Sequence, residues 1–585
     1  MTARHHWPRH ALAVLACAPA VTILLLILRY GVDVPFYDQW VAEAPLFEKV
    51  WGHQFTIGDL WVQHNEHRMV FPKIVYLLLA WATHWNIRAE LVTTWVFACA
   101  ISLGIFCCQR GTVGVGTPLR MLQFVVANLL IFSPAPFEAW LWGISIVNII
   151  PMACIVWSLA IASSHVRHDL KLISCAALAT ISTFSAVGGS LCWLLAGPVL
   201  FVHEDTRNGF ARRHRIAIWV LGFVLTSIAY FHGYEKPPSH PSPMLALREP
   251  ANAIEFLLIF FGNSLTPFTH FDYFVTAQLV GSVLLLSYVA ACEYLMLRRR
   301  DGALIDRSTV WLMLGLYSVL NGLLITFSRL GFGPVAAMWP RYVSYSANLP
   351  LALLFLLPIL LEDVCERVQS PAAKPVAFSV LSAMLGAALL LHSLKGLEST
   401  TFMRRTQAQR LQGKAALLFI DFFRDESIKT CVTRSDDDVR PLADVLNAFG
   451  FLHPPLLKSP RLQDIERPNA PREVTNGALE RMETVENDDI VMSGWTFVPR
   501  TGTPADAVVL SYDASNGDSI AFAVADMDTE RRAEPPESPM RRAGWQVAFP
   551  AGRLPAGTSK VCAWALDANR AEAIRLPGCR EVMRG

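Results

Sequence analysis

Charge is scarce in this chain. Asp, Glu, Lys and Arg make up 17% of its 585 residues, whereas 53% of the residues are hydrophobic. A soluble protein of this size carries more charge, so a soluble enzyme is excluded. The formal net charge of +2 gives no reason to expect a nucleic-acid partner. The twelve cysteines lack the spacing of metal ligands, so zinc is not expected. These absences indicate a polytopic membrane protein.

Long apolar runs fill the chain up to about residue 395, and none follows Arg404. The first run follows several basic and histidine residues (Arg4, His5, His6, Arg9 and His10) and has no small-residue cleavage site before Asp33. We therefore expect an uncleaved first helix. In total we expect about eleven transmembrane helices. They lie at roughly 11–28, 89–108, 121–134, 146–163, 172–187, 190–203, 215–231, 272–297, 309–327, 343–361 and 376–394.

Lysine and arginine concentrate in alternate connections between these runs, and the positive-inside rule places such connections in the cytoplasm together with the N-terminus. The basic residues are Arg110, Arg120, Arg167, Lys171, Arg207, Arg212, Arg213, Arg215, Arg298, Arg299, Arg300, Arg367 and Lys374. Two further apolar segments, 71–85 and 254–261, fit interfacial helices, because counting either as a span would invert the charge rule. The tail then emerges on the far side, which is periplasmic in a Gram-negative cell.

The tail is charged and free of apolar spans. Residues 398–482 predict a helical and irregular linker, and 483–585 predict a soluble all-β, sandwich-like domain behind a transmembrane domain at 1–397. Cys562 and Cys579 could pair in an oxidising compartment, although unpaired buried cysteines are equally natural there. The expected strands are 490–495, 507–512, 519–524, 544–549 and 560–565.

Polar clusters fall on the far side of the predicted membrane. They are Asp33 with Asp38, His64-Asn-Glu-His-Arg68, Phe137–Gly143, Ser182–Gly189, and Ser328–Gly333 with Arg341-Tyr342. We expect them to converge in one cavity open to that side. A carboxylate there can act as a general base, arginines can clamp a phosphate, and tryptophans such as Trp140 and Trp142 can stack on sugar rings. This combination predicts chemistry on a lipid-linked, anionic sugar.

Each cluster also has a structural interpretation. Asp38 can be a solvated residue at a helix end, Trp140 and Trp142 can belong to a membrane-interface belt, and Arg341 can reach lipid headgroups. The run His64–Arg68 is harder to explain in this way, because a structural turn rarely needs His, Glu, His and Arg together.

At these residues the chain resembles the GT-C superfamily of polyprenyl-phosphate-sugar-dependent glycosyltransferases. The resemblance rests on Tyr37-Asp38-Gln39-Trp40 followed by His64–Arg68, and on the stretches Phe137–Gly143 and Arg329–Tyr342; it covers roughly residues 10–395. It implies two juxtamembrane helices, at 41–51 and 71–85, and makes Asp38 the catalytic base. The superfamily often has two adjacent acids, whereas Gln39 follows Asp38 here, so the sequence does not support a divalent metal and no cofactor is predicted.

The sequence therefore predicts an inverting, integral-membrane glycosyltransferase of the bacterial inner membrane. It would transfer a sugar from a polyprenyl-phosphate donor to a glycan or lipid acceptor of the cell envelope at the periplasmic face, among membrane lipids. The predicted catalytic residues are Asp38 and Glu66, and the predicted substrate-binding residues are His64, His67, Arg68, Glu138, Trp142, Arg329, Arg341 and Tyr342. The alternatives are a lipid-linked glycan polymerase or ligase, a polysaccharide transporter or flippase, and a non-catalytic envelope protein that acts through its β-domain.

Overall fold

The computed structural model describes residues 9–113, 117–202, 209–268, 272–368, 373–423, 428–433, 438–467, 477–485, 489–498, 503–529 and 543–584. Arg4, His5, His6 and Arg207, which entered the topology prediction, lie outside these residues. The chain folds as two compact units, each assembled from separate stretches of sequence. The helical unit comprises Met1–Arg29, Thr56–Val75 and Glu90–Met403, and the tail unit comprises Tyr30–Phe55, Tyr76–Ala89 and Arg404–Gly585.

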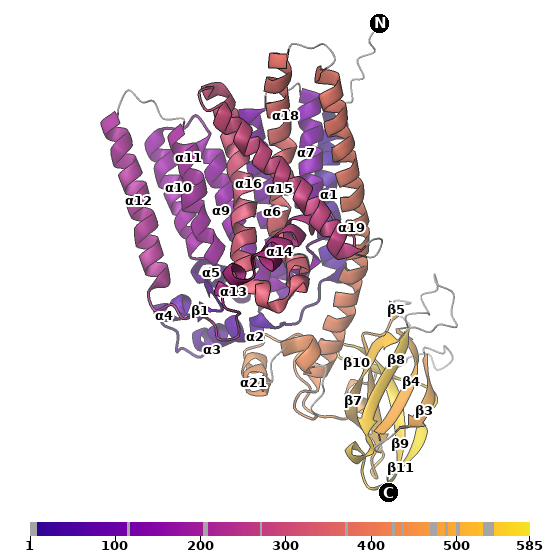
Figure 1. Ribbon diagram of the computed structural model, residues 1–585. Coiled ribbons are helices and arrows are strands. Elements are labelled where there is room, and N and C mark those ends of the chain that lie inside the picture. Colours follow the sequence, from indigo (N-terminus) through magenta and orange to yellow (C-terminus); the bar gives the residue numbers. More distant parts are fainter. Residues whose placement is uncertain are drawn as a thin grey trace. The chain divides into compact units, whose positions relative to one another are not determined.

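Long apolar helices dominate the chain (Figure 1). Within the described ranges, eight are long and apolar enough to cross a membrane. Several expose large apolar side chains, such as Leu25 (60%) and Leu286 (68%), as expected for helices that face lipid. The eight are α1 (Arg9–Tyr30), α6 (Ile87–Thr112), α9 (Ile146–Ala162), α12 (Gly209–Phe231), α15 (Tyr273–Leu297), α16 (Gly302–Arg329), α18 (Asn348–Val368) and α19 (Ala373–Leu418).

Other apolar helices are shorter. They are α5 (Val70–Thr83), α7 (Thr117–Ile131), α10 (His168–Thr183), α11 (Leu191–Val202) and α14 (Pro250–Gly262). The expected interfacial segments at 71–85 and 254–261 coincide with α5 and α14. The prediction is confirmed in its general form, several long apolar helices, and the number of about eleven spans is not.

Arginine residues stand at both ends of helix α16. Near its first turns, the Arg307 Nε donates to the carbonyl of Thr112 at 3.0 Å, and Arg298 just before it pairs with Asp363 at 3.2 Å. At its last residue stands Arg329. Because 28 residues of α-helix rise about 42 Å, the predicted cytoplasmic arginines and Arg329 lie at opposite ends of the helical unit.

Glycines bring α14 and α15 into backbone contact. A Cβ on Gly262 would lie 1.9 Å from the carbonyl oxygen of Ala277, and one on Gly281 would lie 1.9 Å from that of Leu258. No larger side chain fits at either position without moving a backbone. The C-terminal end of α14 is therefore fixed against α15.

The tail unit contains an antiparallel β half-barrel (Figure 1). The main path of its sheet is β10-β9-β6-β7-β8-β4-β3, with β11 paired to β9 and β5 paired to β4. The expected all-β domain is confirmed, but its strands form one continuous sheet, not the two sheets of a sandwich. The strands are β3 (Gly477–Thr484), β4 (Asp489–Val498), β5 (Thr503–Pro504), β6 (Ala507–Asp513), β7 (Ser519–Thr529), β8 (Gly544–Pro550), β9 (Gly557–Asp567), β10 (Glu572–Arg575) and β11 (Arg580–Arg584).

The end of α19 belongs to the core of this domain. Ala415 and Phe419 pack with Val509 and Trp564 of the sheet. The helix runs without a break through the predicted boundary at residue 397. The linker expected at 398–482 thus contains the end of α19, the short helices η7 (Lys429–Thr433), α21 (Arg440–Ala448) and η8 (Leu462–Ile465), and most of β3.

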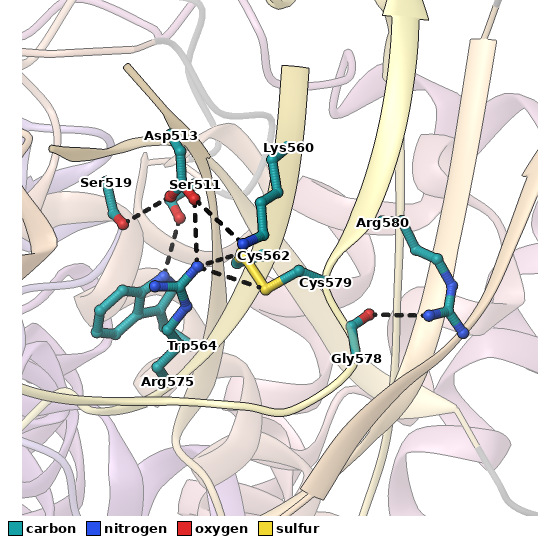
Figure 2. The surroundings of a disulfide bond; sticks show 10 residues. All are labelled: Ser511, Asp513, Ser519, Lys560, Cys562, Trp564, Arg575, Gly578, Cys579 and Arg580. Atoms are coloured by element: carbon teal, nitrogen blue, oxygen red, sulfur yellow. Dashed lines mark hydrogen bonds and ion pairs between the residues drawn. A yellow bond between two sulfur atoms is a disulfide. The ribbon is translucent and has the colours of Figure 1, made fainter. Parts of the chain in front are cut away.

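A disulfide joins Cys562 and Cys579 (Figure 2). The guanidinium of Arg575 lies against it, with one nitrogen 2.8 Å from the Cys562 sulfur and 3.3 Å from a carboxylate oxygen of Asp513. The indole N–H of Trp564 beneath donates to the Ser511 hydroxyl at 2.9 Å. The pairing that the sequence left open is formed in this structure.

Candidate functional site

The motif His64–Arg68 forms a two-strand hairpin in the helical unit. Strands β1 (Gln63–His64) and β2 (His67–Arg68) pair so that His64 faces His67, and Asn65 turns the chain with a φ of 48°. Asparagine tolerates this left-handed conformation better than most residues. The hairpin thereby presents Glu66 at its tip.

Glu66 lies among one guanidinium and two histidine rings. Its carboxylate lies 2.6 Å from the guanidinium of Arg329, 3.3 Å from His240 and 3.8 Å from His67, and its side chain is only 16% exposed. Burial raises the pKa of Glu66, but the charges of His67, Arg329 and His240 outweigh it, so the pKa lies below its usual value. Glu66 is therefore an ionised carboxylate that joins the hairpin to the end of α16.

Backbone contacts settle the protonation pattern of His67. Its Nδ1 accepts from the backbone N–H of Val187 at 3.2 Å, so a neutral ring carries its proton on Nε2, the atom that faces Glu66. Val187 begins the short helix η2 (Val187–Ser190). A Cβ on Gly189 of this helix would lie 1.7 Å from the Ser182 carbonyl, which explains a glycine at this position. The predicted cluster Ser182–Gly189 therefore supports His67.

Arg68 has a different role from the one that the sequence suggests. Its side chain is 5% exposed, and all three guanidinium nitrogens donate to backbone carbonyls. These carbonyls belong to Trp61 at 2.7 Å, Tyr230 at 3.2 Å and His232 at 2.6 Å. A guanidinium used in this way ties chain segments together, so the geometry favours a structural role over phosphate binding.

A second acid–arginine pair involves Glu138 and Arg341. Glu138 lies on α8 (Phe137–Leu141) and Arg341 on η6 (Pro340–Tyr342), with 3.2 Å between carboxylate and guanidinium. Their side chains are 31% and 22% exposed. The guanidinium lies over three aromatic rings, at 4.2 Å from the centroid of Trp339, 5.4 Å from Tyr342 and 5.9 Å from Trp142. Arg341 is thus a cation held between one carboxylate and several aromatic faces.

A cavity adjoins this pair. It has an empty volume of about 710 Å³, its open mouth included. Trp140, two residues after Glu138, and Tyr345, four residues after Arg341, line it, whereas Glu138 and Arg341 themselves do not. Its walls are mostly apolar, and within them the Tyr345 hydroxyl donates to the Asn148 amide oxygen at 2.8 Å. Apolar walls of this kind suit contact with an apolar group.

Trp140 is part of the protein interior. It is 3% exposed and donates its indole N–H to the Ser133 carbonyl at 2.7 Å. In the structure Arg329 pairs with Glu66, and Arg341 pairs with Glu138.

Asp38 belongs to the tail unit, at the start of α2 (Asp38–Ala42). The preceding Tyr37 has a φ of 49°, and this strained residue is held by the C-terminal part of the same unit. Its N–H donates to the carbonyl of Val432 at 2.7 Å, and its hydroxyl donates to that of Thr430 at 3.1 Å. The chain thus fixes the backbone immediately before Asp38 with a segment from its far end.

Buried polar residues shape the rest of this loop. Gln39 is fully buried; its side-chain oxygen accepts from the N–H of Phe36 at 3.2 Å, and its amide nitrogen lies 3.5 Å from the carboxylate of Glu43. Glu43, also fully buried, accepts from the indole N–H of Trp85 at 3.1 Å. Gln39, the residue next to Asp38, is therefore used for structure here. Asp33 accepts from the N–H of Ile87 at 2.8 Å and holds the neighbouring helix start.

Several of these residues escaped the sequence analysis. His240 gave no signal because it lies in an irregular connection, and its partner Glu66 is far away in the sequence. Trp339 lies two residues before the predicted Arg341 and was the easiest to find. Among the residues that the structure describes, no group of His, Cys, Asp or Glu is arranged to hold a metal ion. Comparisons of the chain with protein-family models, with curated proteins and with solved structures gave no match.

Proposed function

We propose that the protein is an integral-membrane glycosyltransferase that takes a sugar from a polyprenyl-phosphate donor. The observation that carries the proposal is the position of Arg341, which pairs with Glu138 among aromatic rings, on segments whose following residues line an apolar cavity. A lipid-phosphate sugar has the three matching parts: an apolar chain, an anionic phosphate and a polar ring.

Each part of such a donor has a counterpart in the helical unit. The apolar wall of the cavity suits the first isoprenoid units, and the half-buried ring of Trp339 suits the sugar. The guanidinium of Arg341 suits the phosphate, whose negative charge grows as the glycosidic bond breaks. Because Glu138 holds Arg341 before the donor arrives, the cation needs little reorganisation in the transition state.

The Glu66 cluster supplies a second guanidinium, that of Arg329, together with two histidine rings. Arg329, His67 and His240 share one carboxylate, so the cluster carries no excess of negative charge that would repel a phosphate. His64, on the opposite strand of the hairpin, stays a candidate for donor binding. We assign Arg68 to the support of the hairpin.

The proposed reaction is a single displacement. The hydroxyl oxygen of the acceptor forms a bond to the anomeric carbon while the bond from that carbon to the phosphate oxygen breaks, which inverts the configuration. The proton of the hydroxyl passes to the carboxylate of Asp38, and the polyprenyl phosphate leaves as an anion. The strained backbone at Tyr37, fixed by two hydrogen bonds, supports a role for Asp38 that needs a defined orientation.

The proposed location is the bacterial inner membrane, with transfer at the periplasmic face to an envelope glycan or lipid. The basic residues at the start of α16, opposite to Arg329, support this orientation through the positive-inside rule. The disulfide Cys562–Cys579 supports an oxidising compartment for the tail unit.

The test is a turnover assay with the purified full-length protein in lipid nanodiscs. A panel of polyprenyl-phosphate monosaccharides is offered with a lipid extract as acceptor, and release of polyprenyl phosphate is measured for the wild type, Asp38→Asn and Asp33→Asn. We expect turnover of at least one donor, a loss of about 10²-fold or more in Asp38→Asn, and near-normal activity in Asp33→Asn, whose amide oxygen can still accept from Ile87. A fully active Asp38→Asn variant, or no turnover of any donor, contradicts the proposal.

A further inference from the structure

Lys395 is an ammonium group enclosed in the helical unit. It lies on α19 and its side chain is completely buried. Its Nζ donates to the Asn263 backbone carbonyl, to the Asn263 side-chain oxygen at 2.7 Å and to the Thr266 carbonyl at 3.1 Å. A buried ammonium is tolerated only when oxygen atoms replace its water shell, and its three donors are used here. The turn after α14 is therefore built around this cation.

The ammonium fixes the orientation of the Asn263 amide. Lys395 can only donate hydrogen bonds, so the atom of Asn263 that faces it must be the oxygen. The hydroxyl of Tyr273 donates to the same oxygen at 2.7 Å. The amide nitrogen must then point away, where it lies 3.1 Å from the carbonyl oxygen of Ala337 and 3.5 Å from that of Trp339.

Those carbonyls belong to the segment that carries Arg341. The ring of Trp339 is the aromatic face nearest to the guanidinium, at 4.2 Å, and Arg341 follows two residues later. The end of α14 cannot shift easily, because Gly262 is in backbone contact with Ala277 of α15. His392, one helical turn before Lys395, also holds the segment after α14, because its Nδ1 lies 3.0 Å from the Ser264 carbonyl.

We propose that Lys395 is a positioning residue for Arg341, acting through the amide of Asn263 and the backbone of Trp339. The inference rests on the proposed function in so far as Arg341 binds the donor phosphate, whereas the hydrogen-bonded chain itself does not depend on it. A cation remote from the substrate thus sets the place of the cation that meets the substrate.

Two substitutions separate the links of this chain. Lys395→Met removes the ammonium and leaves the amide of Asn263 free to rotate. Asn263→Asp keeps an oxygen facing Lys395 but removes the N–H donors toward Ala337 and Trp339. It therefore breaks the hydrogen bonds to the Arg341 segment and keeps those to Lys395. Ser399→Ala is the matched control, because Ser399 is also buried on α19 and donates only to the carbonyl of Lys395, at 2.8 Å.

The first readout is hydrogen–deuterium exchange of the full-length protein in nanodiscs. In Lys395→Met and Asn263→Asp we expect faster exchange of peptides covering 334–342, and in Ser399→Ala we expect wild-type exchange there. Lys395→Met can change exchange simply because it disturbs folding. Asn263→Asp controls for this, since all the oxygen atoms that accept from Lys395 are kept in that variant. Unchanged exchange of 334–342 in Asn263→Asp overturns the inference, whatever the activity.

The second readout is donor turnover. We expect kcat/KM for the polyprenyl-phosphate sugar to fall by about tenfold in Lys395→Met and in Asn263→Asp, the factor for one lost hydrogen bond to a charged group. In an Arg341→Ala background both substitutions should have little further effect, because the residue that they position is gone. Losses that multiply in the double variants overturn the positioning role. If no donor is turned over at all, the proposed function fails, and the exchange result still decides the inference.

Discussion

Two glutamate–arginine pairs in the helical unit look alike in chemistry and differ in surroundings. Glu66 meets Arg329, His67 and His240 and is 16% exposed, and the hydroxyl of Tyr230 donates to its backbone carbonyl at 2.6 Å. Glu138 has Arg341 as its ion-pair partner and is 31% exposed, and the next residue, Ala139, lines the cavity. The first pair joins a hairpin, an irregular connection and the end of α16. The second holds one cation ready beside an open space. Under the proposed function, similar pairs serve folding in one place and donor binding in another.

We expect the largest effect from a substitution that breaks the second pair, Glu138–Arg341. Arg341→Ala should lower kcat/KM for the lipid-phosphate donor by about 10²-fold or more and leave thermal unfolding nearly unchanged, because the pair is partly solvated. Arg341→Lys should recover only part of the activity, since an ammonium cannot lie flat over the Trp339 ring as a guanidinium does. A large fall in the unfolding temperature of Arg341→Ala would erase the distinction between the two pairs.

The next effect concerns the first pair and falls on stability. Glu66→Gln should lower the free energy of unfolding by about 2 kcal/mol at neutral pH, because Arg329 and the two histidines lose their common counter-charge. The folded pKa of Glu66 lies below the ordinary 4.5, so its stabilisation is complete above pH 4.5 and disappears as the pH falls through the folded pKa. The difference between wild type and Glu66→Gln should therefore shrink in acid, which thermal unfolding at several pH values measures.

Asp506, in the tail unit, is expected to change stability with pH in the opposite direction to Glu66. Burial, and next the charge of Asp567, raise the pKa of Asp506 from 3.8 to about 6. A raised folded pKa means that the acid form is favoured in the fold, so stability falls as the pH rises from about 4 to 6. Asp506→Asn keeps an oxygen for the N–H of Ala568 and removes the charge.

This variant should be more stable than the wild type at pH 7 by about 1 to 2 kcal/mol, and the gain should vanish near pH 4. Exchange of peptides from β9, followed as a function of pH, measures it. A gain that is the same at both pH values would show that the charge of Asp506 is not its cause.

The smallest expected effect tests the aromatic surroundings of Arg341. Trp339→Phe keeps a ring beneath the guanidinium and should change kcat/KM by about twofold to fivefold, in line with a cation–π contribution of about 0.5–1 kcal/mol. Trp339→Leu should have a larger effect, since the face is lost. The backbone carbonyl that Asn263 contacts is kept in both variants. If Phe and Leu behave alike, the ring contributes nothing to the role of Arg341.

The elements of the fold were predictable where local pattern decides them. Apolar length gave the long helices, and alternation gave the positions of β4, β6, β7, β8 and β9. Strand β3 was missed because six of its eight residues are half-buried or exposed and four of the eight are charged or polar, so it does not alternate. The predicted last span ended at residue 394, one residue before Lys395, because a lone charge looks like the end of an apolar helix.

The candidate site was predictable in its residue types and not in its partners. Arg329, Arg341, Glu66 and Glu138 were all selected from the sequence. Their pairing depends on contacts such as that between Glu66 and Arg329, which are 263 residues apart. Local periodicity carries no information about such contacts. For the same reason, the sequence did not indicate that the Asp38 loop shares a compact unit with the C-terminal residues.

The tie between Tyr37 and Thr430 has a consequence for the order in which the protein matures. The two residues are 393 positions apart, so at a synthesis rate of about 5–20 residues per second the Asp38 loop waits roughly 20–80 s for its partner. During that interval the first helix is already in the membrane while its following loop lacks the support that holds Tyr37. Synthesis must therefore pass Val432, about three quarters of the 585-residue chain, before these hydrogen bonds can fix the loop.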